Sequence, residues 1–331
     1  MAEYKSIRGQ NVRVVSSDPA NPILGQVWYN TTSKSLKGQE FGVASWATGG
    51  NMGTAKAYLG SAGTQTAALA FGGGDVAPPL TPSNTTEEYD GSAWTAGGNL
   101  STARYYLGGA GTQTAGLAFG GNPPATGATE EYDGSSWTAG GTMSNARFGL
   151  GSATSGTQTA ALGFGGAGLV TPPPIANLTE EYNGTAWTAG GNMIQGRNVL
   201  SGAGTQTAAL AMGGEYPPVS SLTDLTEEYD GSAWTAGGNM NLSKKVATGF
   251  GLQTAAISAG GEAPARTDAT EEYDGSAWTT TASMALAKRQ LGGAGTTSSG
   301  LVFGGNAPTG NIAATEEFTG GGPTTVTISG S

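Results

Sequence analysis

The chain contains no cysteine and no histidine, and these two absences exclude many kinds of chemistry. Without them there is no disulfide, no Ser-His-Asp or Cys-His nucleophile, and no thiolate or imidazole ligand for zinc or copper. Any catalysis would depend on Asp, Glu, Tyr, Lys or Arg. We therefore expect no catalytic residues, no metal site and no cofactor.

Charged residues are also scarce, at 11% of the 331 residues, against about 25% in an average soluble domain. The net charge of -10 has the wrong sign for binding a nucleic-acid backbone or an anionic membrane surface. No apolar run reaches the roughly 18 residues of a membrane span, and residues 1–10 lack the apolar stretch of a secretory signal. We expect a protein made in the cytoplasm, without a signal peptide, that neither inserts into a membrane nor binds nucleic acid.

Glycine, proline and aromatic residues are plentiful instead. The chain has 59 Gly and 15 Pro, together more than a fifth of its length, and its hydrophobic fraction of 37% includes 7 Trp, 11 Tyr and 8 Phe. This apolar content is enough to fill a core, so the composition indicates a folded chain that is dense in turns.

The chain is an internal repeat. The segment 86–98, TEEYDGSAWTAGG, returns with small changes at 129–141, 179–191, 226–238 and 270–283. This period of 40 to 50 residues suits a four-stranded propeller blade, and no sustained 3.6-residue apolar pattern supports helical repeats. The tryptophans that mark the units, expected to pack between blades, are Trp46, Trp94, Trp137, Trp187, Trp234 and Trp278.

Turn signals divide each unit into four strands, a to d. In the second unit we expect strand a at Arg104–Ala110, a turn at 111–113, strand b at Thr114–Phe119, strand c at Thr129–Tyr132 and strand d around Trp137. The Asp133-Gly134 turn between strands c and d is a strong hairpin signal. Strands c and d are therefore expected to form a tight antiparallel pair.

Counting the repeated elements predicts a closed ring. A Gly-Gly doublet after strand b and a Glu-Glu pair in strand c each occur six times, but only five of the pairs are followed by Trp. The strand at Trp46 has no strand c before it and completes the last unit, 284–320. We expect an all-β, six-bladed propeller over 41–320, an N-terminal docking segment over 1–40 and a C-terminal tail over 321–331.

The order Gly-Gly, Glu-x-Tyr, Trp, Met and a basic residue resembles the Kelch-repeat propeller family over residues 41–320. The basic residues are Lys56, Arg104, Arg147, Arg197, Lys244 and Lys288. The near-identical units, and the opening segment 21–32, NPILGQVWYNTT, also resemble bacteriophage virion proteins of the fibre or appendage type. This resemblance implies a non-enzymatic structural protein of the virion, located in a tail, neck or capsid appendage.

Two regions are candidate contact sites. Residues 1–40 are expected to bind other virion proteins, with Trp28, Tyr29 and Leu36 as the anchors. Twelve of the 15 prolines fall in the b–c connections, which emerge on the same face as the d–a connections and vary in length while the a–b and c–d turns hardly change. We expect these loops to touch a host-surface glycan or receptor. Their candidate residues are Asp75, Pro78, Pro123, Pro173, Glu215, Tyr216, Glu262 and Asp268.

Two alternatives stay open. The Glu-Glu pairs do not suit a glycosidase, because adjacent strand residues point to opposite faces, and we expect them to pair with the repeat's Lys or Arg or with backbone N–H groups. A glycan-degrading propeller would use carboxylates at the channel mouth: Asp75, Glu215, Asp224, Glu262 or Asp268. The other alternative is a capsid decoration protein without a receptor role.

Overall fold

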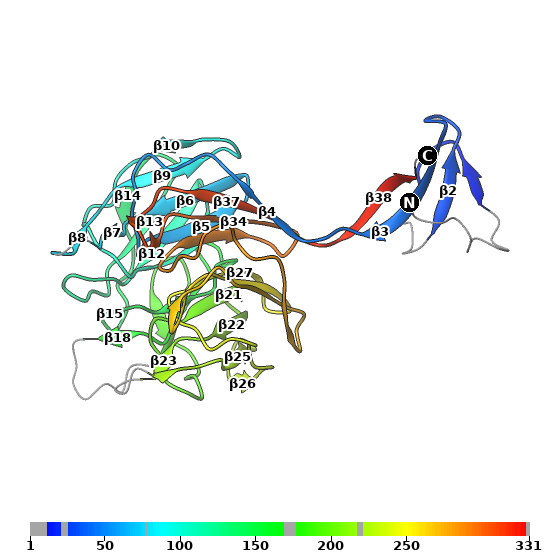
Figure 1. The fold of residues 1–331 in the computed structure, drawn as a ribbon. Helices are drawn as coiled ribbons and strands as arrows, with labels where there is room; N and C mark the ends of the chain where they lie inside the picture. The colour runs from blue at the N-terminus through cyan, green and yellow to red at the C-terminus, as the bar shows by residue number, and fades with distance from the viewer. Residues whose placement is uncertain (1–11, 21–25, 77–78, 169–176, 217–220, 329–331) are drawn as a thin grey trace. The chain divides into compact units, whose positions relative to one another are not determined.

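The computed structural model describes residues 12–20, 26–76, 79–168, 177–216 and 221–328 of the 331-residue chain. Every regular element in these ranges is a β-strand (Figure 1). The chain divides into two compact units: unit 1 comprises Met1–Ala44 with Gly320–Ser331, and unit 2 comprises Ser45–Thr319. The described residues include no helix that is long and apolar enough to cross a membrane.

Unit 1 is one four-stranded sheet in the order β1-β2-β3-β38. Strands β1 (Arg13–Val15) and β2 (Val27–Asn30) run parallel, while β2 and β3 (Ser35–Phe41) run antiparallel. Strand β38 (Pro323–Ile328) pairs antiparallel with β3. The segment predicted as a C-terminal tail thus contributes a strand to the same sheet as the N-terminal segment.

Unit 2 contains six four-stranded antiparallel sheets, numbered here in chain order. They are sheet 1 (β5 Gly60–Thr64, β6 Ala67–Phe71, β9 Thr86–Tyr89, β10 Trp94–Ala96), sheet 2 (β11 Gly108–Thr112, β12 Ala115–Phe119, β13 Thr129–Tyr132, β14 Trp137–Ala139), sheet 3 (β16 Gly151–Ser152, β17 Ala161–Phe164, β19 Thr179–Tyr182, β20 Trp187–Ala189), sheet 4 (β21 Ser201–Thr205, β22 Ala208–Met212, β25 Thr226–Tyr229, β26 Trp234–Ala236), sheet 5 (β27 Thr248–Leu252, β28 Ala255–Ala259, β31 Thr270–Tyr273, β32 Trp278–Thr280) and sheet 6 (β33 Gly292–Gly295, β34 Ser299–Phe303, β37 Thr315–Thr319, β4 Ser45–Thr48).

The first strands of the sheets contact one another in order, β5 with β11, β11 with β16, and so on to β33, which contacts β5. Repeated four-stranded sheets that pack in this way are consistent with a β-propeller-like fold. The predicted pairing of the Trp46 strand with the last repeat is confirmed, because β4 pairs with β37 and places Trp46 opposite Phe318.

The strand boundaries in the second repeat differ from the prediction. Strand β11 begins at Gly108, not at Arg104, because Tyr106 has a φ of 58°, which is incompatible with a continuous strand. The strand then extends through Thr112, so the turn lies at Gln113 and Thr114 and not at 111–113. Strands β13 and β14 agree with the sequence prediction.

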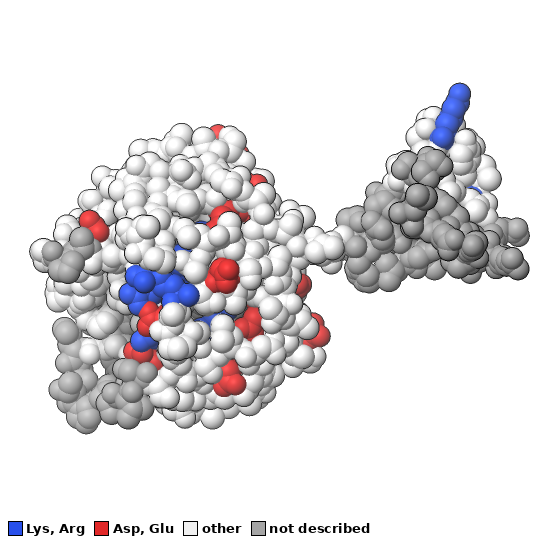
Figure 2. Space-filling view, in the orientation of Figure 1, with Lys and Arg blue, Asp and Glu red and all other residues white. Residues whose placement is uncertain are grey.

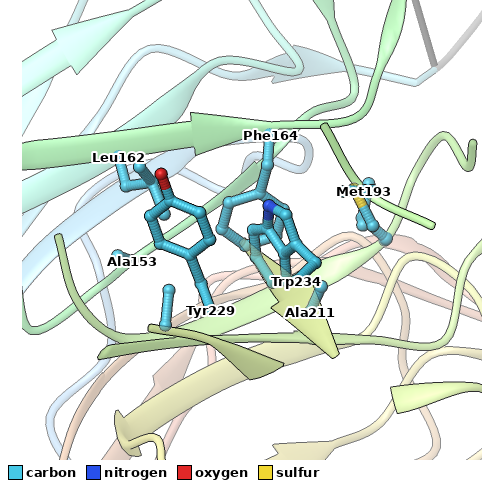
Figure 3. Packing of buried hydrophobic residues seen from close by; sticks show 9 residues of the cluster. Ala153, Leu162, Phe164, Met193, Ala211, Tyr229 and Trp234 are labelled. Carbon is cyan, nitrogen blue, oxygen red and sulfur yellow. The ribbon is translucent and has the colours of Figure 1, made fainter. Parts of the chain in front are cut away.

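The core lies between neighbouring sheets and is built from one repeated contact. In sheets 1 to 5, the Trp of the fourth strand packs on the preceding sheet, as Trp234 does on Phe164, with ring centroids 4.9 Å apart (Figure 3). The indole N–H of Trp234 also donates to Thr179 Oγ1 at 2.9 Å. Trp94, Trp137, Trp187 and Trp278 make the same hydrogen bond to the preceding sheet. The predicted packing role of these tryptophans is confirmed.

Candidate functional site

Six backbone hydrogen bonds form a closed cycle where the chain enters the first strand of each sheet. Each bond runs from an amide N–H to the carbonyl oxygen of the equivalent residue in the preceding sheet, over 2.7–2.9 Å. We call these residues the ring; they are Tyr58, Tyr106, Gly149, Val199, Val246 and Gln290. All six have φ between 46° and 60°.

This ring conformation is costly for the residues that adopt it. Residues with β-branched side chains rarely adopt left-handed φ values, yet the β-branched Val199 and Val246 both do so here. Such residues each cost about 1–3 kcal/mol and persist where the surrounding structure holds them. The cycle of hydrogen bonds supplies that restraint, so the ring is a rigid frame for the side chains beside it.

The ring residues line two adjoining cavities. One, of about 100 Å³, lies between the ring and the residues that follow it in sequence, chiefly Leu59, Leu107, Leu150, Leu200 and Leu291. The other, of about 150 Å³, lies between five ring residues and the charged side chains of Glu215, Lys245, Glu262 and Arg289. We call the second cavity the mouth.

One side of the mouth is a chain of ion pairs. Lys245 Nζ lies 2.6 Å from Glu215 Oε2 and 3.8 Å from Glu262 Oε1, and Arg289 pairs with Glu262. Figure 2 shows basic side chains gathered at one place on unit 2, with acidic side chains next to them. The four groups carry two positive and two negative charges, so this side of the mouth is electrically neutral.

The other side of the mouth is aromatic. The rings of Tyr58 and Tyr106 have centroids 4.0 Å apart, and Tyr105 lies 6.0 Å from Tyr58. Gln290 Nε2 donates to the Tyr58 hydroxyl at 2.6 Å. Burial raises the pKa of Tyr106 far above its usual value of 10, so this hydroxyl stays protonated at neutral pH.

The residues beside the ring differ from repeat to repeat. In each sheet, the residue before the ring position pairs with a residue at the start of the b–c connection. These pairs are Ala57–Gly74, Tyr105–Asn122, Phe148–Ala167, Asn198–Glu215, Lys245–Glu262 and Arg289–Asn306. No two pairs are alike, although the strand-c sequence Thr-Glu-Glu-Tyr is identical in five repeats.

Within the described residues, the start of the b–c connection belongs to a short two-stranded sheet in five of the six repeats. These sheets are β7 (Gly74–Asp75) with β8 (Thr81–Pro82), β15 (Arg147–Phe148) with β18 (Ala167–Gly168), β23 (Glu215–Tyr216) with β24 (Ser221–Leu222), β29 (Glu262–Ala263) with β30 (Ala265–Arg266), and β35 (Asn306–Ala307) with β36 (Gly310–Asn311). In the third repeat the partner strand is β15, which precedes the first strand of sheet 3, and in the second repeat the connection makes only the isolated bridge Tyr105–Asn122.

The structure brings only two of the sequence-predicted loop residues into the mouth, Glu215 and Glu262. The hydroxyl of Tyr216 pairs instead with Thr223 at 3.1 Å, and Asp75 accepts a hydrogen bond from Asn311 at 3.3 Å. Pro123 is exposed and Asp268 half-buried, and neither lines the mouth. Pro78 and Pro173 lie outside the described residues.

Sequence reasoning missed seven mouth residues: Tyr58, Tyr106, Val199, Lys245, Val246, Arg289 and Gln290. A signal for them is present in the chain, because they stand one or two places after the repeat's basic residue, where every unit carries a different pair. Of the alternative catalytic carboxylates, Glu215 and Glu262 reach the mouth, whereas Asp75, Asp224 and Asp268 do not line it.

The Glu-Glu pairs have structural partners, as predicted. The first Glu of each pair is buried and lies next to the buried Lys or Arg of its own repeat; Glu130, for example, lies 3.0 Å from Arg104. In five of the six pairs the second Glu accepts a hydrogen bond from a tyrosine in the next sheet, as Glu88 does from Tyr132 at 2.5 Å. This tyrosine partner was not predicted.

In unit 1, the three predicted anchors lie in different environments. Trp28 is fully buried within the unit, and its indole N–H donates to Asp18 at 3.0 Å. Tyr29 and Leu36 are cross-strand partners on the opposite face, and both are half-buried. Trp28 therefore stabilises unit 1 itself, while Tyr29 and Leu36 retain exposed surface.

Within the described residues, no group of three or more acidic side chains is placed to hold a metal ion. No protein-family model matches the chain, and no curated protein matches it.

Proposed function

We propose that this chain is a non-enzymatic recognition protein of a bacteriophage particle, in which a closed six-bladed propeller presents its mouth and b–c connections to a host-surface ligand. Four observations support the closed propeller: six four-stranded sheets, the cyclic contacts of their first strands, the cycle of ring hydrogen bonds, and the pairing of β4 with β37.

The observation that carries the recognition role is the contrast between constant and variable positions within this one chain. The packing residues repeat from sheet to sheet, whereas the six pairs beside the ring are all different. Structure alone requires no such difference at equivalent positions. A binding site does require it, because a ligand needs one asymmetric set of contacts.

The docking role is proposed for unit 1. Its sheet joins residues 13–41 with 323–328 in a compact unit of its own, and it carries the sequence that resembles phage virion proteins. The cross-strand pair Tyr29 and Leu36 offers a partly exposed apolar contact of the kind that anchors protein interfaces.

Incorporation into particles tests this proposal. Full-length chain that carries Tyr29→Ala and Leu36→Ala should be depleted at least ten-fold from purified phage particles, as measured by quantitative mass spectrometry. The matched control, Tyr105→Ala in unit 2, should be incorporated at the level of the unsubstituted chain. Absence of the unsubstituted chain from particles would refute the virion role.

A second candidate, glycan hydrolysis, is favoured by one observation: Glu215 and Glu262 both line the mouth, where paired carboxylates could act on a sugar. Both carboxylates, however, are engaged by Lys245. Incubation with host-surface polysaccharide distinguishes the candidates. Release of reducing ends that is lost in Glu262→Gln would establish the hydrolase and remove the non-enzymatic proposal.

A further inference from the structure

We infer that the mouth binds a single neutral pyranose unit of a surface glycan, with Tyr58 and Tyr106 against the face of the sugar ring and the ion-pair chain against its hydroxyl groups. This inference rests on the proposed recognition function and specifies its ligand. Three features of the mouth carry it: its neutral charge, its division into an aromatic and a polar side, and its unpaired polar atoms.

Charge balance selects against an ionic ligand. The two cations at the mouth already have carboxylate partners: Lys245 lies 2.6 Å from Glu215 and 3.8 Å from Glu262, and Arg289 pairs with Glu262. An anionic ligand would have to compete with these carboxylates, and a cationic ligand with the Lys and Arg. A neutral ligand leaves the ion pairs intact, so its binding carries no such cost.

The mouth has an aromatic side and a polar side, and a sugar likewise has apolar C–H groups and polar hydroxyl groups. The rings of Tyr58 and Tyr106, tilted by 49° with centroids 4.0 Å apart, form an apolar wall, against which the C–H groups of a pyranose can pack. The polar side presents groups that only donate, Lys245 and Arg289, and groups that only accept, Glu215 and Glu262. A hydroxyl group both donates and accepts, so adjacent sugar hydroxyls match this alternation.

Polar atoms beside the mouth that lack a hydrogen-bond partner also favour a ligand with hydroxyl groups. Gln290 is 7% exposed, and its side-chain oxygen has no hydrogen-bond partner among the described residues. The same holds for Asn198 Oδ1 and Arg289 Nε. Buried polar groups are normally hydrogen-bonded, and these atoms comprise both acceptors and a donor. A ligand rich in hydroxyl groups can supply both kinds of partner.

The size of the mouth limits how much of a glycan enters. Its volume of about 150 Å³ is below the roughly 300–1,000 Å³ of pockets that enclose drug-sized ligands. A terminal sugar is therefore expected to enter the mouth, while the rest of the glycan lies outside it.

Saturation-transfer NMR with the full-length protein tests the inference. The probes are the methyl glycosides of glucose, galactose, mannose and N-acetylglucosamine, with glucuronic acid as the charged comparison. We expect at least one neutral glycoside to receive saturation at its ring protons, with an affinity that salt changes less than two-fold. Tyr106→Gly should weaken it at least ten-fold, and glycine is tolerated because Gly149 holds the equivalent ring position.

Two variants serve as controls. Tyr132→Phe alters a contact between sheets away from the mouth, and Tyr29→Ala alters unit 1 only; both should keep binding within three-fold of the unsubstituted chain. The inference fails if no neutral glycoside binds, if Tyr106→Gly binds normally, or if glucuronic acid binds more tightly and in a salt-dependent way. These failures leave particle incorporation, and so the virion role, to be judged separately.

Discussion

Phe318 lies in sheet 6 at the position where the other five sheets carry a tyrosine. Glu272 in sheet 5 therefore has no tyrosine hydroxyl from which to accept a hydrogen bond, unlike the five equivalent glutamates. The five other contacts, such as Tyr132 to Glu88, span 2.5–2.6 Å. No side-chain hydrogen bond of Glu272 occurs among the described residues, and burial raises the pKa of this carboxyl. The interface between sheets 5 and 6 therefore differs from the others.

Two further contacts are altered at this same interface. At each of the other five, a glutamine side chain donates to two backbone carbonyls of the preceding sheet, as Gln113 does to Ala68 and Tyr89. Sheet 6 has Thr297 at the equivalent position. The indole of Trp46 donates to Ala282 O, which leaves Thr270 Oγ1 unpaired among the described residues.

We predict that Phe318→Tyr stabilises the protein only together with Thr281→Gly. A Cβ on Gly97 would lie 2.6 Å from the Tyr132 hydroxyl, so glycine makes room for the tyrosine, and Thr281 occupies the equivalent place in sheet 5. The double variant should gain a hydrogen bond to Glu272, with a coupling free energy of about 1–3 kcal/mol in a denaturant double-mutant cycle. Additive effects, or the same coupling in a Glu272→Gln background, would contradict this.

We predict that Thr297→Gln strengthens the same interface by about 1 kcal/mol, because it restores the two hydrogen bonds that a glutamine makes elsewhere. The measurement is the free energy of unfolding, together with hydrogen exchange of β33 and β34. Before the substitution these strands should exchange faster than β11 and β12. Equal exchange rates in all sheets would show that the altered interface is not the weakest one.

We predict that Arg147→Met lowers the free energy of unfolding by about 3–5 kcal/mol, since it leaves the buried carboxylate of Glu180 without its cation. Arg147 is fully buried, 3.1 Å from Glu180 Oε1, and its guanidinium also donates to the carbonyls of Gly163, Gly165 and Leu178. Glu180→Gln is the control and should cost less, because three carbonyl acceptors remain. A loss below 1 kcal/mol for Arg147→Met would contradict the prediction.

We predict that the tyrosines that bond between sheets lose their stabilising contribution at alkaline pH. Burial, assisted by the hydrogen bond to Glu88, raises the pKa of Tyr132 to about 12 from its usual 10. The folded state therefore holds this proton more tightly, so the contribution is complete below pH 10 and is lost between pH 10 and 12. The difference in unfolding free energy between the unsubstituted chain and Tyr132→Phe should shrink over that range. A difference that stays constant would refute the pKa assignment.

We predict that unit 1 loosens in acid through Asp18. Side-chain hydrogen bonds from Lys37, Asn30 and Trp28, with the Lys37 bond the strongest cause, lower the pKa of Asp18 to about 2 from 3.8. Its stabilising contribution is present above pH 4 and is lost as the pH falls toward 2. The indole N–H resonance of Trp28 should shift in that range, and Asp18→Asn should abolish the shift.

The repeated elements of the structure could be predicted from the sequence. The recurring Trp, Asp-Gly and Glu-Glu elements predicted the strands, the tight hairpins and the pairing of the Trp46 strand with the last repeat. Such local signals depend on turn chemistry and on side-chain alternation along a strand, which neighbouring residues largely decide. They also predicted that the Glu-Glu pairs would have structural partners.

Only the tertiary structure decided which residues meet at the mouth. Lys245 and Glu215 stand 30 positions apart, yet the Nζ and Oε2 atoms lie 2.6 Å apart, because the closed cycle of ring hydrogen bonds brings all six repeats to one place. The sequence pointed to the proline-rich b–c connections, of whose predicted residues Glu215 and Glu262 line the mouth. The sequence also could not show that residues 323–328 pair with the N-terminal segment. Pairing between strands so far apart in the chain depends on where the fold of the residues between them places the two strands. The sequence by itself determined the repeated unit, and the fold determined which residues of different units meet at the mouth.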